Sequence, residues 1–208
     1  MGLKKRNIEE NLPGLTPERN LVLIGYRATG KTAVGALLAQ RLARAFVDLD
    51  QVLEEEMGRS ITDLVAAEGW PEFRRREKEL VARYGRADGR VLATGGGAVL
   101  DPENVEVLRQ NGVVVWLRAD PATIQERLSR DHREVGQRPS LTGGSTLGEV
   151  AEVLQNRQPL YAAAAQIVID TDRHSLDQVV EKVLAALNEL GKKGKRGKGE
   201  KGKKRNSI

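Results

Sequence analysis

Residues 25–32 constrain this chain more than any other segment, because their sequence GYRATGKT fits the phosphate-loop pattern G-x-x-x-x-G-K-[ST]. The apolar run 21–24 precedes the loop, and apolar residues recur at helical spacing from Val34 to Leu42 after it. In this strand–loop–helix order, glycines let backbone N–H groups turn toward phosphate oxygens at a helix N-terminus. The alternative is a chance glycine turn before an ordinary helix. We interpret the segment as a nucleotide-phosphate site.

The residues of this loop are expected to divide the nucleotide site between them. Lys31 is predicted to reach the β- and γ-phosphates, and the hydroxyl of Thr32 is predicted to bind Mg²⁺, which keeps several waters and needs few protein ligands. The other nucleotide-binding positions predicted within the loop and at the start of its helix are Ala28, Thr29, Gly30 and Ala33.

Length and charge indicate one folded domain with a basic extension. A chain of 208 residues suits one domain. Residues 191–208 hold nine Lys or Arg and one Glu, whereas the whole chain has a formal net charge of +5, so the remainder is net acidic. We predict a flexible leader at 1–19, a domain at 20–190 and a disordered tail at 191–208. The tail lacks aromatic residues that stack on bases, so we favour a solvated tail over a nucleic-acid-binding one.

Composition also limits the compartment. The chain has no cysteine, which excludes a disulfide framework and a Cys-ligated metal site. The N-terminal residues are charged and polar, and the sequence has no uninterrupted apolar stretch of membrane-spanning length. We therefore predict a cytoplasmic protein that contacts no membrane.

Apolar strand-like runs alternate with helical stretches along the chain. The runs are 21–24, 46–49, 91–94, 113–117 and 167–169, and the residues suited to begin the intervening helices include Ser60, Asp101 with Pro102, Asp120 with Pro121, and Ser175. This alternation predicts a three-layer α/β/α fold with a five-stranded parallel sheet and a ligand crevice at the carboxyl ends of the strands.

The polar stretch 131–146, rich in Gly and Arg, interrupts the alternation. A loop of this length within a compact domain is often functional, and we interpret it as a mobile lid. The alternative is an ordinary surface loop.

Asp48 and Asp50 are predicted to serve one site. Residues two apart on a strand point to the same face, and two carboxylates this close are costly unless a cation lies between them. We assign Asp48 to the metal and Asp50 to the acceptor hydroxyl. The alternative is that the pair caps the next helix.

Two further segments are predicted to complete an acceptor site. Arg74 and Glu77 share a helix face, so Glu77 would hold Arg74 ready to bind a carboxylate with two hydrogen bonds. The alternative is a solvated charged helix with i, i+3 pairs. Gly95, Gly96 and Gly97 follow a strand-like run and leave no side chain between a ligand and the backbone. Here the alternative is a plain tight turn.

Together these residues resemble shikimate kinase, in the family's order from about Leu21 to Leu187. The motifs are the phosphate loop, Asp-x-Asp at 48–50, Phe-Arg-Arg-x-Glu at 73–77, Gly-Gly-Gly at 95–97, Arg-Pro at 138–139 and Arg-x-Pro-Leu-Tyr at 157–161. The resemblance implies the phosphate-loop kinase fold and transfer of the ATP γ-phosphoryl group to the 3-hydroxyl of shikimate, with Mg²⁺, in aromatic amino acid biosynthesis.

The resemblance also implies a role for each matching position. Shikimate would be held by Asp50, Arg74, Arg157 and the glycines Gly95, Gly96 and Gly97, with both arginines on its carboxylate and Asp50 accepting the hydroxyl proton. Lys31 and Arg138 would steady the transferring phosphoryl group. Arg127 would pack against adenine, and Arg173 lies in the segment that completes that pocket. Ala28 departs from the family pattern, because many members carry a third glycine there.

Two alternatives remain open at this point. Another small-molecule kinase of the same architecture, for gluconate or a nucleotide, would share the loop and lid but would not need two arginines and three glycines around an anionic polyol. A nucleotide-dependent switch or nucleic-acid-associated module could combine the loop with the basic tail. We favour a monomer whose partners are shikimate and ATP.

Overall fold

A computed structural model describes residues 12–130 and 148–203. Its centre is a sheet of five parallel strands in the order β2-β3-β1-β4-β5. The strands are β1 (Asn20–Ile24), β2 (Phe46–Asp48), β3 (Val91–Ala93), β4 (Gly112–Arg118) and β5 (Ile167–Asp170). The predicted five-stranded parallel sheet is confirmed, and the predicted strand ends lie within one residue of the observed ones.

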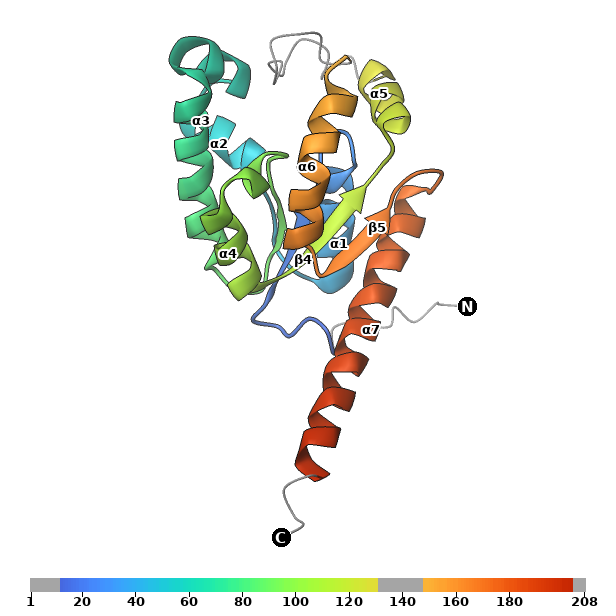
Figure 1. The fold of residues 1–208 in the computed structure, drawn as a ribbon. Helices are drawn as coiled ribbons and strands as arrows, with labels where there is room; N and C mark the ends of the chain where they lie inside the picture. The colour runs from blue at the N-terminus through green and yellow to red at the C-terminus, as the bar shows by residue number, and fades with distance from the viewer. Residues whose placement is uncertain (1–11, 131–147, 204–208) are drawn as a thin grey trace, which may run out of the picture.

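Helices cover both faces of this sheet (Figure 1). On one face lie α1 (Lys31–Leu42) and α7 (Leu176–Lys203), and on the other lie α2 (Leu49–Met57), α3 (Ile61–Gly85), α4 (Pro102–Gln110) and α6 (Val150–Ala164). A 3-10 turn, η2 (Ala98–Leu100), follows β3, and α5 (Pro121–Arg130) follows β4. The three-layer α/β/α prediction is therefore confirmed.

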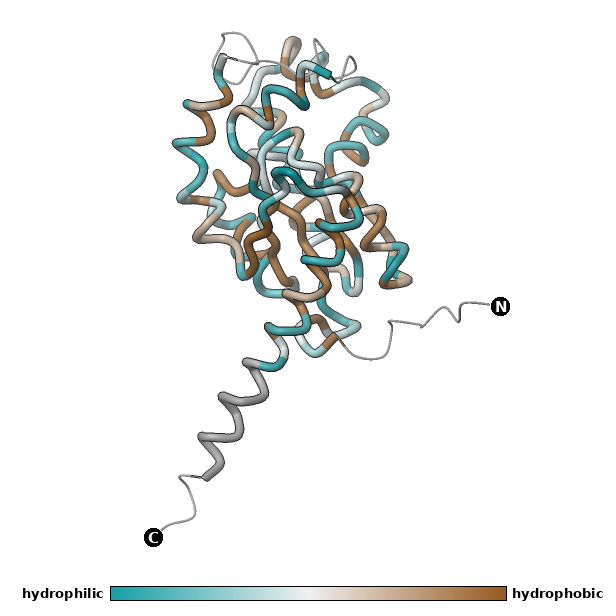
Figure 2. Tube along the Cα trace, turned by 90° about the vertical axis from the view of Figure 1, so that its right-hand side faces the viewer, coloured by the Kyte–Doolittle hydropathy of each residue, from teal (hydrophilic) through white to brown (hydrophobic). Residues whose placement is uncertain are grey.

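Each face of the sheet carries its own hydrophobic core. In β1, Leu21 and Leu23 pack against α1 and α7, whereas Val22 and Ile24 pack against α3 and its neighbours. All four side chains are at most 1% exposed, which explains why the strand is a continuous apolar run rather than an alternating one. Figure 2 shows these hydrophobic segments gathered inside the molecule.

Local signals place the helix ends as expected. Ser60 accepts a hydrogen bond from the N–H of Asp63 at 3.0 Å, and Asp101 accepts one from the N–H of Glu103 at 2.8 Å, with Pro102 in the first turn. Gly69 interrupts α3 with φ 81° and ψ 170°, so Pro71 begins a second helical segment within it. This break fixes the direction in which residues 70–77 face.

The two ends of the domain differ from the prediction. Leu15 is only 4% exposed and belongs to the core beneath α7, so the predicted flexible leader is wrong for its last residues. The backbones at Pro13 and Gly191 pack so closely that a Cβ at Gly191 would collide with Pro13. The predicted domain boundary at residue 190 lies inside α7, which continues to Lys203. The predicted disordered tail at 191–208 therefore overlaps this helix as far as Lys203.

None of the helices in residues 12–130 and 148–203 combines the length and the apolar composition that a bilayer-spanning helix needs.

Candidate active site

The phosphate loop links β1 to α1 in the predicted order. Gly25 has φ 142°, and a Cβ there would collide with the carbonyl oxygen of Leu117, so glycine is required. Gly30, at φ 92°, is the N-cap of α1. The Lys31 ammonium donates to the carbonyl oxygens of Gly25 and Tyr26, at 2.9 Å each, and thereby lies across the loop. The loop thus leads into a helix N-terminus with a lysine ammonium held across it, which suits phosphate.

Ala28 occupies the strained position of this loop. Its φ of 60° lies in the left-handed region, where a Cβ is disfavoured and glycine is not. Arg127 donates a hydrogen bond to the carbonyl oxygen of Ala28 at 3.2 Å. This geometry explains in physical terms why a glycine would suit the position better.

A pocket lies over the loop, and its empty volume, including the part that is open to solvent, is about 780 Å³. It is lined by Arg27, Ala28, Gly30, Lys31, Thr32, Ala33, Asp48, Asp50, Thr94, Arg127 and Leu128. The predicted nucleotide-binding residues of the loop line it, apart from Thr29. The Thr29 hydroxyl instead donates to the carbonyl oxygen of Tyr26 at 2.8 Å and supports the loop from within.

Thr32 and Asp48, the predicted metal ligands, touch each other in this pocket. The Thr32 hydroxyl donates to Oδ2 of Asp48 at 2.6 Å. A hydroxyl and a carboxylate at a phosphate site are ligands of the type Mg²⁺ takes, with waters and phosphate oxygens supplying the rest. No cluster of three or more His, Asp or Glu side chains suited to a metal occurs in the described part of the chain.

Asp48 and Asp50 both line this pocket, but the prediction that they lie two apart on one strand was wrong. Asp48 ends β2 and caps α2, accepting from the N–H of Asp50 at 3.1 Å. Asp50 therefore lies in the first turn of α2 and not on the strand. Both carboxylates therefore line one pocket, and Asp48 also caps the next helix, because α2 begins directly after the strand.

Arg127 is oriented by a residue that the sequence did not single out. Its guanidinium donates to the hydroxyl of Thr171 at 3.0 Å and to the carbonyl oxygen of Thr171 at 2.7 Å. Thr171 follows β5, so its position after a strand was the available signal. Arg173 is exposed, has φ 56°, and is not among the described residues that line the pocket.

A second pocket adjoins the first, and its empty volume, including the part that is open to solvent, is about 460 Å³. It is lined by Tyr26, Arg27, Asp50, Ile61, Trp70, Phe73, Arg74, Glu77, Gly95, Gly96, Gly97 and Arg157. The predicted acceptor residues thus come together from α2, α3, α6 and the loop after β3. An apolar wall with three arginines and two carboxylates suits a small acid that also carries hydroxyl groups.

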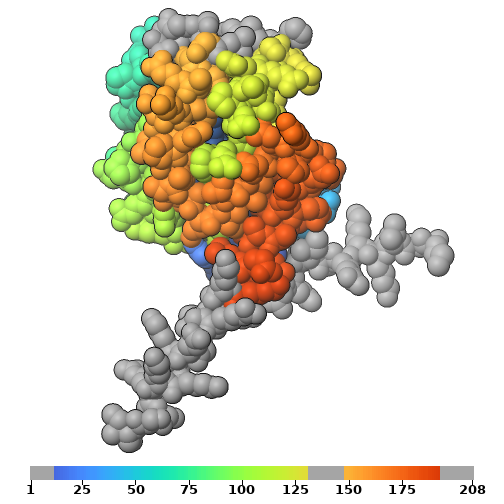
Figure 3. Space-filling model, turned by 45° about the vertical axis from the view of Figure 1, so that its right-hand side comes forward, coloured from blue at the N-terminus to red at the C-terminus, as the bar shows by residue number. Residues whose placement is uncertain are grey.

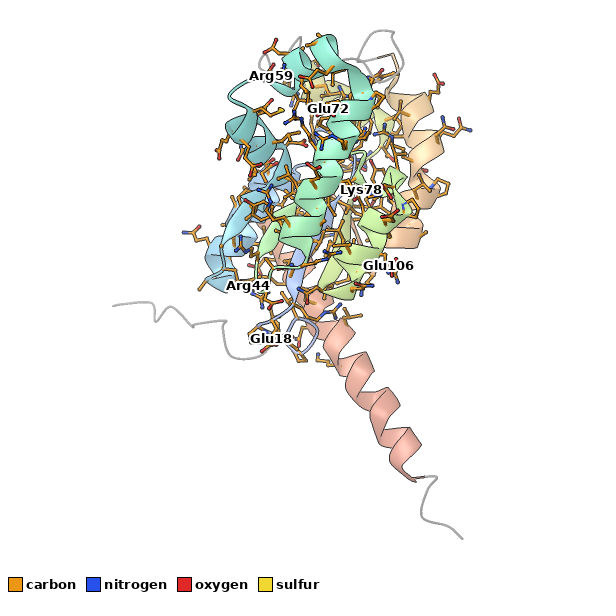
Figure 4. All side chains as sticks on the ribbon, turned by 90° about the vertical axis from the view of Figure 1, so that its left-hand side faces the viewer. Glu18, Arg44, Arg59, Glu72, Lys78 and Glu106 are labelled. Atoms are coloured by element: carbon orange, nitrogen blue, oxygen red, sulfur yellow. The ribbon has the colours of Figure 1, made fainter. Side chains whose placement is uncertain are left out.

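The three consecutive arginines of α3 separate as helical geometry requires. Arg74 faces the pocket and donates to Glu77 at 2.5 Å, whereas Arg75 and Arg76 donate to Glu72 on the outer side of the helix. Figure 4 shows Glu72 on that outer side. The solvated-helix alternative therefore holds for Arg75 and Arg76 but not for Arg74.

The guanidinium of Arg74 is fixed on several sides. Its Cζ lies 4.8 Å from the ring centroid of Phe73 and 5.4 Å from that of Trp70. A Cβ at Gly97 would lie 2.5 Å from the same Cζ, so only glycine leaves this space to the arginine. The glycines were expected to admit a ligand, and the structure adds that Gly97 admits Arg74.

Glu77 is a buried carboxyl beside Asp50. It is 4% exposed, and burial raises its pKa; the Arg74 charge opposes that rise, and the Asp50 charge adds to it. A Cβ at Gly95 would collide with Oε1 of Glu77 and lie 2.9 Å from Oδ1 of Asp50. Gly95 thus leaves space for both carboxyl groups.

The helix α6 holds the middle glycine in place. Tyr161 donates its hydroxyl hydrogen to the carbonyl oxygen of Gly96 at 2.5 Å, and Arg157 donates to the same oxygen at 3.3 Å. The ring of Tyr161 stacks on Trp116 of β4 with 5.6 Å between centroids. In Figure 3, α6 (orange) lies between α4 and α7, with α5 beside its upper end. The helix therefore connects the acceptor pocket to the sheet.

Asp50 and Arg27 line both pockets, so the two pockets meet at these side chains. A phosphoryl group that moves from a ligand in the first pocket to a ligand in the second would pass the carboxylate of Asp50 and the guanidinium of Arg27. The sequence predicted the role of Asp50, but Arg27 was seen only as a variable position of the phosphate loop. Arg138 and Pro139 of the predicted lid lie outside the described residues.

Comparison with known proteins gives consistent matches. A family model for shikimate kinase matches residues 27–188. The curated shikimate kinase of Symbiobacterium thermophilum is 48% identical over 172 residues, which cover 83% of this chain and 98% of the relative. That of Syntrophus aciditrophicus is 45% identical over 175 residues, covering 80% and 90%. Among solved structures, shikimate kinase from Acinetobacter baumannii in complex with shikimate matches with a TM-score of 0.76 and 33% identity, over 82% of this chain and 93% of that one.

Proposed function

The chain belongs to the shikimate kinase family, and on this premise we propose how its residues divide the transfer of the ATP γ-phosphoryl group to the 3-hydroxyl of shikimate. The observation that carries the proposal is the meeting of the two pockets at Asp50. A donor pocket built on the phosphate loop and an acceptor pocket built from arginines and glycines share one carboxylate wall. That arrangement suits direct transfer between two bound small molecules.

The donor pocket binds the triphosphate of ATP. The backbone of the phosphate loop, from Ala28 to Ala33, contacts the phosphates, and Lys31 neutralises charge on the β- and γ-phosphates. Thr32 and Asp48 would hold Mg²⁺, which supplies charge neutralisation on the phosphate oxygens when bound. The contact between these two side chains, at 2.6 Å, supports their sharing one ion.

The adenine side of the donor pocket is formed by Arg127. Its hydrogen bonds to Thr171 and Ala28 hold the guanidinium plane beside the phosphate loop, where it can pack against the base. Arg173 stays a proposed member of this side, since it lies two residues after Thr171.

The acceptor pocket binds shikimate through its carboxylate and hydroxyl groups. Arg74 and Arg157 bind the carboxylate, while Gly95, Gly96 and Gly97 let the ring approach the backbone. Arg74 is already held by Glu77 and two aromatic rings, so little side-chain freedom is lost on binding. Trp70 and Phe73 supply the apolar wall for the ring carbons.

Asp50 aligns the 3-hydroxyl and accepts its proton as the phosphoryl group arrives. General-base action of this kind contributes about 10²- to 10⁴-fold. Lys31 and Arg138 stabilise the charge on the transferring group. We further propose that the protein acts as a monomer in the cytoplasm.

A coupled assay of ADP release tests the function. We expect shikimate-dependent ADP formation that requires Mg²⁺, and little ADP when gluconate or a nucleoside monophosphate replaces shikimate. ADP formation that is independent of shikimate, or greater with gluconate, would refute the proposal.

A further inference from the structure

An ion pair lies buried beside the junction of the two pockets. Nη2 of Arg27 is 3.6 Å from Oε1 of Glu149, and the two side chains are 7% and 1% exposed. Arg27 belongs to the phosphate loop, and Glu149 immediately precedes α6. A buried ion pair contributes little net stability in general, because desolvation offsets the attraction, so this pair calls for another explanation.

The position of Arg27 gives the first part of that explanation. Together with Asp50 it lines both pockets. Its guanidinium carbon lies 5.6 Å from the ring centroid of Tyr26, and the Tyr26 ring is buried in an apolar cluster with Val150 and Val153 of α6. The guanidinium is therefore packed at the boundary that a transferring group crosses.

Glu149 gives the second part. It is the N-cap residue of α6, but its side chain makes no capping hydrogen bond there, and its carboxylate lies against Arg27 of the phosphate loop. About two and three turns further along the same helix, Arg157 and Tyr161 donate to the carbonyl oxygen of Gly96 in the acceptor pocket. One helix thus places a carboxylate on the phosphate loop and two donors on the glycine turn.

We propose that Glu149 is a positioning residue that holds the guanidinium of Arg27 at the junction, where Arg27 contacts the transferring phosphoryl group. The proposal rests on the donor and acceptor assignments above. A phosphoryl group in transfer carries charge on its outer oxygens, and a planar guanidinium that is already fixed can bond two of them without reorganisation. Nη2 of Arg27 lies 3.6 Å from Glu149, and the same arginine lines both pockets, so Glu149 restrains it beside the path of transfer.

A purely structural role for the pair makes a different prediction. If the pair only joined α6 to the phosphate loop, removing either side chain would lower stability and would disturb the binding of both substrates. If Glu149 acts through Arg27, its removal affects turnover, and the effect disappears once Arg27 is gone. A double-mutant cycle separates these two cases.

The experiment uses the full chain and measures kcat, both KM values and Tm for four proteins: wild type, Glu149→Gln, Arg27→Ala and the double variant. We expect Arg27→Ala to lower kcat by about 10²- to 10³-fold, as loss of a preorganised donor does, and Glu149→Gln by about 10-fold. Both KM values should stay within about threefold, and the double variant should be as active as Arg27→Ala within about twofold. Glu181→Gln, which breaks the exposed pair with Arg41, is the matched control and should leave kcat unchanged.

Rescue of turnover by soluble guanidinium at millimolar concentration is a measurement that a purely structural role of the pair would not affect. Soluble guanidinium should restore part of the turnover of Arg27→Ala but less of the double variant, because Glu149 orients the added cation. Equal rescue of the two proteins would overturn the proposal, as would losses of kcat that multiply in the double variant. If Arg27→Ala proves unstable, Arg27→Lys can replace it, because lysine keeps the positive charge. We expect Arg27→Lys to have a lower kcat than wild type and an unchanged Tm. Wild-type turnover in the same assay tests the kinase function independently, so the two failures are distinguishable.

Discussion

Replacing Gly97 with alanine would place a methyl group against the guanidinium of Arg74. The new Cβ would lie 2.5 Å from Cζ of Arg74, whereas ordinary contacts begin near 3.4 Å. The guanidinium must therefore move by about 1 Å, and a misplacement of that size at a substrate-positioning group costs about 10²-fold in rate. Arg74 cannot move freely, because Glu77 and the rings of Trp70 and Phe73 hold it.

We expect Gly97→Ala to lower kcat/KM for shikimate by about 10²-fold, which corresponds to about 2.7 kcal/mol of transition-state binding. The KM for ATP should stay within twofold, because the donor pocket does not include Gly97 among its described lining residues. Steady-state kinetics with each substrate varied in turn, together with a thermal melt, make these measurements.

The neighbouring glycine supplies the control. A Cβ at Gly96 would lie no closer than 3.4 Å to the protein atoms around it, which are backbone atoms of the phosphate loop, so Gly96→Ala should leave Arg74 in place and change Tm little. If Gly97→Ala keeps kcat/KM for shikimate within about threefold of wild type, then the position of Arg74 does not govern acceptor binding. Equal losses for the two alanine variants would mean that the turn, and not Arg74, is what the glycines serve.

Four further predictions concern single residues. Asp50→Asn should lose about 10²- to 10⁴-fold in turnover while ATP binding, measured by titration calorimetry, is retained; near-normal turnover would remove it from the catalytic role. Thr171→Val removes the hydroxyl that Arg127 binds and should raise the KM for ATP severalfold with the KM for shikimate unchanged, and the reverse pattern would place Arg127 elsewhere. Ala28→Gly should raise the free energy of unfolding in urea by about 1 kcal/mol, since glycine adopts the left-handed conformation without strain; a lower value would argue against strain in the loop. Burial raises the pKa of Tyr161 from 10.0 to about 12, so its contribution to stability is complete below pH 10 and is lost as the pH rises through 12. Tyr161→Phe should flatten that part of the stability profile, and an unchanged profile would contradict the assignment.

The sequence predicted those parts of the fold for which a short local pattern indicates a single kind of structure. Continuous apolar runs separated by helical periodicity describe a buried parallel sheet, and the phosphate loop marks its first turn. Ser60 and Asp101 cap helices as expected, because an N-cap depends only on residues three positions away or fewer. These features are local, so a single sequence contains them.

The parts that the sequence did not predict depend on residues distant along the chain. Arg27 meets Glu149, and Arg127 meets Thr171, through contacts that only the folded sheet creates. Asp50 reaches its site from a helix and not from a strand, since the helix starts directly at Leu49. Asp48 and Asp50 thus line one pocket as predicted, but the strand geometry from which that was predicted was wrong.

For ligand design, the shared wall of the two pockets makes them one binding site with two compartments. A molecule that joins a cyclic carboxylate to a phosphate chain across Asp50 and Arg27 would bind its second half intramolecularly, at an effective concentration set by the linker. Short linkers give effective concentrations in the millimolar range, so two weak fragments can yield a compound about 10²- to 10⁴-fold tighter than either. At the crossing point the carboxylate of Asp50 repels an anionic linker and the guanidinium of Arg27 repels a cationic one, so a neutral linker suits both side chains.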